Sequence, residues 1–79
     1  MTVRQIKIVG PATHAVQVAT ELADADGVEM ISSKPPAIVA DDTVELEVAV
    51  EGTADDIAVA VSNIRKGLPK GASIELAAD

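Results

Sequence analysis

The chain contains no cysteine and no phenylalanine, tyrosine or tryptophan among its 79 residues. Without cysteine, disulfides, thiolate metal sites, iron–sulfur clusters and cysteine nucleophiles are excluded. Without aromatic side chains, the core has to be built from valine, isoleucine, leucine and alanine, which suit pleated strands and close packing of helices on a sheet. The chain is also too short for two cores, so we predict a single domain over residues 1–79 with a thin aliphatic core.

Basic residues are scarce as well. Six lysines and arginines stand against thirteen aspartates and glutamates, which gives a formal net charge of -7. Such a chain repels phosphate backbones and anionic lipids, so neither nucleic acid nor a membrane is an expected partner. No apolar run approaches the ~18 to 20 residues of a membrane span, and the first residues contain no apolar leader. We therefore expect a cytoplasmic protein, with a composition typical of high-GC bacteria and their phages.

The sequence signatures of catalysis, nucleotide binding and metal binding are missing too. Neither a P-loop nor a G-x-G-x-x-G motif occurs, and the serines lack the spaced histidine and aspartate of a hydrolase. Residues 24–27 begin like a calcium loop, but the twelve-residue ligand pattern does not follow. We predict that the protein is not an enzyme and holds no metal or cofactor.

Hydrophobic periodicity predicts strand, helix and strand in the first half of the chain. Ile6 and Ile8 share one face of a strand over residues 3–9, which Gly10 and Pro11 end. A helix starting at Pro11 or Thr13 and ending near Gly27 follows, with apolar residues at helical spacing: Ala15, Val18, Ala19, Leu22 and Ala25. A second strand is expected over residues 28–33.

The second half has the clearest pattern. After a turn at residues 41–42, apolar and polar residues alternate over residues 44–51, which predicts a half-buried strand. Gly52 ends this strand and Thr53 is suited to cap a helix, with acidic residues in its first turn. One apolar face then marks the helix: Ile57, Val61, Ile64 and Leu68. Residues 74–76 supply a short last strand.

The element order β-α-β-β-α-β predicts a ferredoxin-like α+β sandwich. Its antiparallel sheet would have the four expected strands in the order 4-1-3-2, with both helices on one face. The prolines agree with this order, because Pro35 and Pro36 follow an edge strand, where a missing hydrogen-bond donor is tolerated. A different strand order remains an alternative.

Strand alternation also predicts an acidic surface. If the apolar residues of 44–50 face the helices, the glutamates between them face the open side of the sheet. We predict partner contacts on that side at Glu29, Glu45, Glu47, Glu75 and Lys7. The surface is either a docking site for a basic protein segment, an interface between copies of the chain in which Lys7 and Arg4 pair across subunits, or a solvated face in which Lys7 offsets a neighbouring glutamate.

A second candidate site is the turn after the first strand. His14, the single histidine, lies near the expected start of the first helix, whose dipole disfavours the charged imidazolium. A neutral ring there, beside free backbone N–H groups, suits a small ligand, and we predict such a site at Gly10, Thr13 and His14. The alternative is that His14 is an ordinary surface residue.

The layout resembles ACT-like domains over most of the chain. A first strand ends at residues 8–10, a helix covers residues 15–25, residues 27–29 enter the second strand, and residues 44–50 lead to a capped helix. The resemblance implies a small regulatory module that pairs through its sheets and binds amino acids or other small effectors near the first turn. Residues 10–14 depart from the Asp-x-Pro-Gly-like stretch of that family, so the resemblance assigns no binding residue.

Three functional hypotheses follow. The leading one is a small non-enzymatic protein-interaction or oligomerisation module with an acidic sheet face, which binds a protein partner or a further copy of itself. The alternative is an ACT-like regulatory domain that binds a small effector at the first turn. A third is an inhibitor or accessory protein whose acidity imitates nucleic acid.

Overall fold

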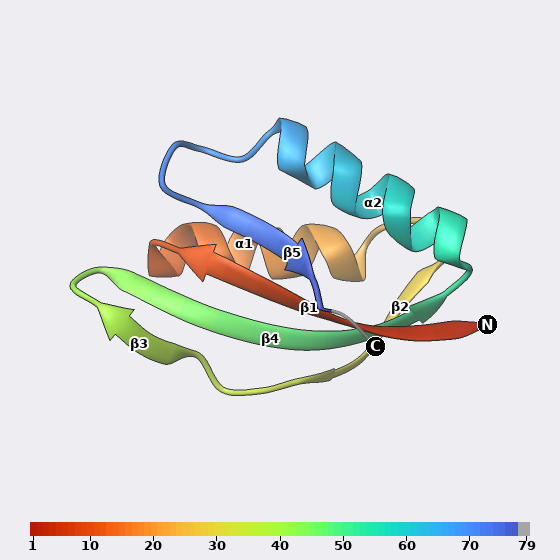
Figure 1. The fold of residues 1–79 in the computed structure, drawn as a ribbon, viewed down its shortest axis with the longest axis horizontal. Helices are drawn as coiled ribbons and strands as arrows, with labels where there is room; N and C mark the ends of the chain where they lie inside the picture. The colour runs from red at the N-terminus through yellow and green to blue at the C-terminus, as the bar shows by residue number, and fades with distance from the viewer. Residues whose placement is uncertain (78–79) are drawn as a thin grey trace.

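In the computed structural model, which describes residues 1–77, two helices pack on one face of an antiparallel sheet (Figure 1). The elements follow one another as β1 (Thr2–Gly10), α1 (Ala12–Ala23), β2 (Val28–Ser33), β3 (Ala37–Ala40), β4 (Thr43–Gly52), α2 (Ala54–Lys66) and β5 (Ser73–Leu76). The strands lie in the order β2-β4-β1-β5, and β3 also pairs with β4. The ferredoxin-like α+β sandwich predicted from the sequence is confirmed.

The sheet differs from the prediction in one detail, which is the additional strand β3. The long strand β4 pairs with β2 only along residues 48–52, so half of its edge is left over. Pro35 and Pro36 interrupt the chain after β2, and the chain then returns to β4 at the pairs Ala37 with Glu45 and Ile38 with Val44. The β2–β3 edge is therefore one interrupted edge strand in two pieces, where the sequence predicted one piece.

The core lies between the helices and one face of the sheet. From β1 it takes Ile6 and Ile8, and from β4 the alternating residues Leu46, Val48 and Val50. The helices add Ala15, Val18 and Leu22 from α1 and Ile57, Ala60, Val61 and Ile64 from α2. The burial alternation predicted for residues 44–50 is thus present, and it fixes which side chains of β4 point away from the helices.

The two helices begin differently. Thr53 caps α2 through its hydroxyl oxygen, which accepts a hydrogen bond from the Asp56 backbone N–H at 3.1 Å. Pro11 is the cap residue of α1, with no side-chain hydrogen bond, and Thr13 lies inside the first turn. Helix α1 ends at Ala23, earlier than predicted, and Gly27 takes its left-handed φ of 76° in the turn that follows.

Replacing Thr53 with alanine should lower the free energy of unfolding by about 1 kcal/mol, because the Asp56 N–H loses its acceptor. Urea denaturation followed by circular dichroism measures the change. Thr53→Ser keeps the hydroxyl and should stay close to the wild type. If the alanine and serine variants had the same stability, the cap would contribute nothing.

Candidate functional site

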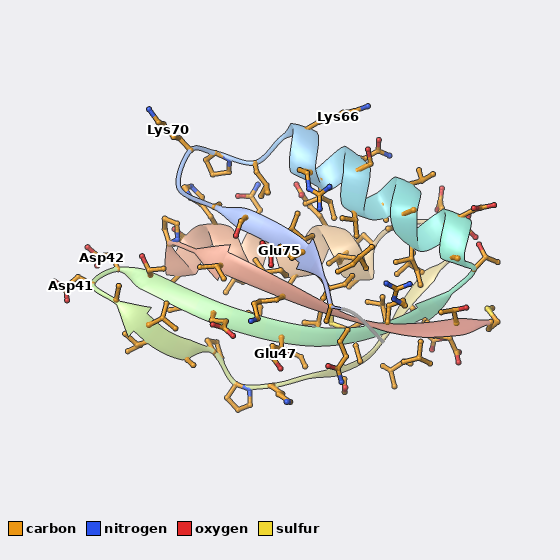
Figure 2. All side chains as sticks on the ribbon, in the orientation of Figure 1. Asp41, Asp42, Glu47, Lys66, Lys70 and Glu75 are labelled. Carbon is orange, nitrogen blue, oxygen red and sulfur yellow. The ribbon has the colours of Figure 1, made fainter. Side chains whose placement is uncertain are left out.

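The face of the sheet opposite the helices is covered by no other element within residues 1–77 (Figure 1). Residues directly opposite one another in a ladder point to the same side. The register sets Lys7 between Glu47 of β4 and Glu75 of β5, and it sets Glu29 of β2 opposite Glu51 of β4. Figure 2 shows Glu47 and Glu75 projecting from this side. We call this surface the acidic sheet face, defined by Gln5, Lys7, Glu29, Glu45, Glu47, Glu51 and Glu75.

Two lysines partly neutralise the acidic sheet face. The Lys7 Nζ lies 3.5 Å from a Glu45 carboxylate oxygen, and the Lys34 Nζ lies 3.1 Å from a carboxylate oxygen of Glu47. The sequence analysis did not point to Lys34. Its backbone N–H donates a hydrogen bond to the Glu47 carbonyl oxygen at 2.9 Å, which holds Lys34 beside that glutamate. Exposed pairs of this kind contribute about 0 to 1 kcal/mol each. Five glutamates against two lysines still leave the surface negative.

Two further glutamates of the acidic sheet face lie where β2 begins and β4 ends, and they have no lysine partner within residues 1–77. Glu29 and Glu51 are direct cross-strand neighbours, and neither has an ion pair within residues 1–77. Like charges directly opposite one another destabilise a sheet. Glu51 was not among the predicted contacts, although it continues the same alternation as Glu45 and Glu47, which is the signal that would have found it.

The acidic sheet face is hollowed beside the interruption between β2 and β3. A cavity of about 210 Å³ is lined by Lys34, Pro35, Ala37, Glu45 and Glu47. A smaller one of about 30 Å³ lies next to it, lined by Gln5, Ser32, Lys34, Glu47, Val48 and Ala49. The Lys34–Glu47 pair therefore separates two shallow depressions in the surface.

The predicted ligand site at the first turn is not assembled around one cavity. Gly10 is buried, and a Cβ there would meet the Ala72 Cβ at 2.9 Å, so the α2–β5 loop fills the space above it. Thr13 is exposed on α1. His14 is half-buried and lines a cavity of about 50 Å³ that includes Pro69 but neither Gly10 nor Thr13. Its Nδ1 atom is buried without a hydrogen-bond partner.

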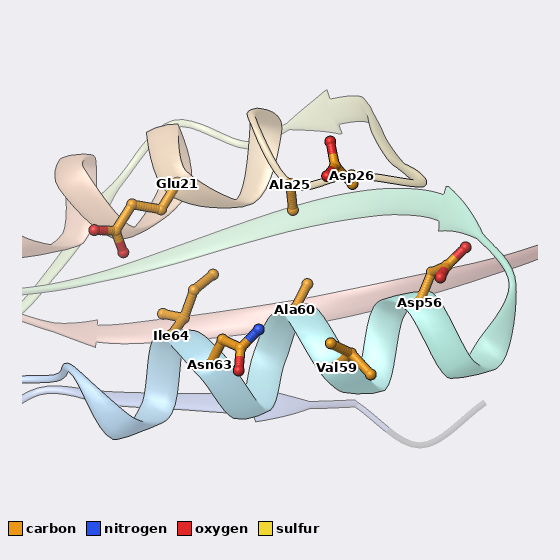
Figure 3. Close-up of a pocket in the computed structure, with 8 residues that line it drawn as sticks. All are labelled: Glu21, Ala25, Asp26, Asp56, Val59, Ala60, Asn63 and Ile64. Carbon is orange, nitrogen blue, oxygen red and sulfur yellow. The ribbon is translucent and has the colours of Figure 1, made fainter.

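A larger groove, which the sequence did not indicate, lies between the outer surfaces of the two helices (Figure 3). Its volume is about 360 Å³, and three carboxylates surround an apolar floor. Its lining residues are Glu21, Ala25, Asp26, Asp56, Val59, Ala60, Asn63 and Ile64. No group of three or more histidines, aspartates or glutamates within residues 1–77 is arranged to hold a metal ion.

Neither α1 nor α2 has the length and the apolar character that crossing a bilayer requires.

Comparison with protein families and with curated proteins finds no match. Solved structures do match. The ACT domain of the GTP pyrophosphokinase of Chlorobium tepidum superposes with a TM-score of 0.72 at 15% identity, over 95% of this chain and 96% of that one. The C-terminal domain of the MgtC protein of Mycobacterium tuberculosis gives 0.71 at 11% identity, over 98% and 86%.

A third match is the YXEP protein of Bacillus subtilis, a dinuclear metal binding peptidase, with a TM-score of 0.56 at 18% identity. The match covers 95% of this chain but 25% of the peptidase, so it concerns one part of that larger protein. At such identities the likeness shows the fold. The chain therefore resembles ACT-like domains in structure, as the layout of its sequence predicted.

Proposed function

We propose that this protein is a non-enzymatic interaction module whose acidic sheet face binds a basic segment of a partner protein. The observation that carries the proposal is the Glu29–Glu51 pair, two uncompensated carboxylates set directly opposite one another on an uncovered surface. A face that served only to be solvated would gain stability from a lysine at either position. Retaining both carboxylates costs stability, and a cationic ligand placed between them removes that cost.

The spacing of the carboxylates fits an extended ligand. Glu45 and Glu47 lie two residues apart on one face of β4, and in a strand that spacing is about 6.6 to 6.8 Å. An extended segment with a lysine or arginine at every second position has the same repeat. Several of its cationic side chains can therefore pair with carboxylates of the acidic sheet face at the same time. Arginine suits this surface especially, because its planar fork binds a carboxylate through two hydrogen bonds.

The repulsion within the pair is measurable in the free protein. Glu29→Gln and Glu51→Gln are each expected to raise the free energy of unfolding by about 0.2 to 1 kcal/mol, because either change removes the repulsion. The double variant should gain no more than one of the singles, since the second change finds no charge left to relieve. Urea denaturation of the wild type and the three variants gives the interaction free energy between the two carboxylates. Additive gains would show that the two carboxylates do not interact, and the central observation would lose its force.

A second candidate function is the ACT-like regulator that binds a small effector. It rests on the buried, unpartnered Nδ1 of His14 in a cavity of about 50 Å³, together with the shared fold. Thermal shift against amino acids and nucleotides tests it, because a ligand at ~100 times its dissociation constant stabilises by about 2.7 kcal/mol. We expect a shift on the order of 10 °C that His14→Ala abolishes. The absence of any shift across both ligand classes would refute this candidate.

A further inference from the structure

The groove between the two helices has carboxylates at both of its ends (Figure 3). At one end are Asp26 and Asp56. A Cβ on Gly27 would collide with the Asp56 carboxylate, which therefore lies beside the turn that holds Asp26. At the other end is Glu21, which also lines the neighbouring cavity of about 50 Å³ together with Ile64. Ile64 and Asp56 are eight residues apart on α2, so the two acidic ends are separated by ~12 Å of helix.

The surface between the two acidic ends is apolar. Ala25, Ala60 and Ile64 form its floor, and Val59 lies beside them with 58% of its surface exposed. None of the eight residues that line the groove is a lysine or an arginine. Its volume of about 360 Å³ is in the range of small-molecule sites, whereas a helix with its side chains is ~10 to 12 Å across and needs far more space. The groove therefore fits a narrow molecule with an apolar middle.

The carboxylates of the groove have no cation beside them. Glu21 lies in the last turn of α1, where the helix dipole disfavours a negative charge, and that turn contains no basic residue. Within residues 1–77 none of Glu21, Asp26 and Asp56 forms an ion pair. A positive charge at each end of the groove would offset these unfavourable charges. The groove thus calls for a ligand with separated cationic groups.

We propose that this groove binds an elongated aliphatic polyamine, with an ammonium group at each acidic end and the methylene chain on the apolar floor. Each ammonium donates hydrogen bonds to carboxylate oxygens, and the methylene groups leave water on the floor between them. A metal ion has one centre of charge and no apolar part, so it would match only one end of the groove. The net charge of -7 also concentrates cations near the protein. The groove lies on the helical side of the sheet, so the proposal is independent of the acidic sheet face (Figure 1).

The length of the ligand tests the proposal at constant ligand charge. Diaminobutane and diaminooctane each carry two ammonium groups, but only the longer diamine can reach both acidic ends of the groove. Isothermal titration calorimetry on the whole chain at physiological salt should show about tenfold tighter binding of diaminooctane. In Glu21→Gln one end of the groove has lost its carboxylate, so most of this preference should disappear.

Two double variants of equal net charge locate the site. Glu21→Gln/Asp26→Asn removes one carboxylate from each end of the groove, and Glu29→Gln/Glu51→Gln removes two from the acidic sheet face. Spermidine, a linear polyamine, should bind about tenfold more weakly to the groove variant and within about twofold of the wild type to the sheet-face variant. Circular dichroism establishes that each variant is folded.

A wild-type chain that binds none of the three amines at millimolar concentration would overturn the polyamine site. So would equal affinities for the two diamines, or equal losses of spermidine binding in the two double variants, because both results indicate attraction to net charge alone. The sheet-face variant leaves the groove intact and the groove variant leaves the acidic sheet face intact. Failure of the polyamine site is thereby separated from failure of the proposed function.

Discussion

Leu22→Ala is expected to lower the free energy of unfolding by about 3 to 5 kcal/mol. Leu22 is 0% exposed and is among the largest fully buried side chains of the protein. Its neighbours in the core are aliphatic, without one aromatic ring that could swing into the space left behind. Since a domain of this size has a total stability of ~4 to 12 kcal/mol, a substantial part of the Leu22→Ala chains should be unfolded.

Val16→Ala is the matched control for this change. Val16 lies on the same helix but is 58% exposed, so its truncation removes little packing, and alanine has the higher helix propensity. Its stability should stay within about 0.5 kcal/mol of the wild type. Urea denaturation followed by circular dichroism compares the two variants. If Leu22→Ala were as stable as Val16→Ala, α1 would not be packed on the sheet as described.

Gly52→Ala is the second change with a large expected effect, a loss of about 3 kcal/mol. Gly52 ends β4, where it lies opposite both Thr2 of β1 and Val28 of β2. A Cβ at this position would collide with the backbone carbonyl oxygen of Gly27. Because backbone cannot swing aside as a side chain can, the start of β2 has to move. The movement would also displace the adjacent Glu29–Glu51 pair.

Gly67→Ala provides the comparison, since a Cβ there has the Ile64 carbonyl oxygen as its nearest neighbour, at an ordinary 3.8 Å. With a φ of -97°, alanine fits this position, and it should leave stability unchanged or raise it by about 0.4 to 1 kcal/mol. Denaturant midpoints measure both variants, and amide chemical shifts of residues 27–30 report on the start of β2. Equal midpoints for the two glycine variants would contradict the close approach of β2 and β4.

The sequence predicted those elements whose signals are local. The alternation of residues 44–51 and the cap at Thr53 needed no knowledge of neighbouring elements, and both are present. Strand β3 could not be predicted in this way, because four residues are too few for a periodic pattern. It forms because β4 is longer than β2 and offers free backbone groups to whatever segment follows the prolines.

The candidate sites likewise include features that follow from the local sequence and features that depend on distant segments. The side of the sheet on which Glu45 and Glu47 lie follows from strand alternation alone, whereas the contact of Lys34 with Glu47 depends on the path of the chain after β2. The predicted ligand site at the first turn rested on His14 beside free backbone N–H groups, and a ligand bound there would also need space above Gly10. Whether that space is open is decided by the α2–β5 loop, whose Ala72 lies against Gly10, and no pattern near Gly10 reveals that contact.

The most direct test of the proposed function compares two variants of equal net charge for binding of one labelled peptide of alternating lysine and alanine. Glu29→Gln/Glu51→Gln neutralises two carboxylates of the acidic sheet face, and Asp55→Asn/Asp56→Asn neutralises two at the start of α2. Fluorescence anisotropy at physiological salt should show about a tenfold weaker affinity for the first variant and little change for the second. Equal losses, or a larger loss for the α2 variant, would contradict binding at the acidic sheet face.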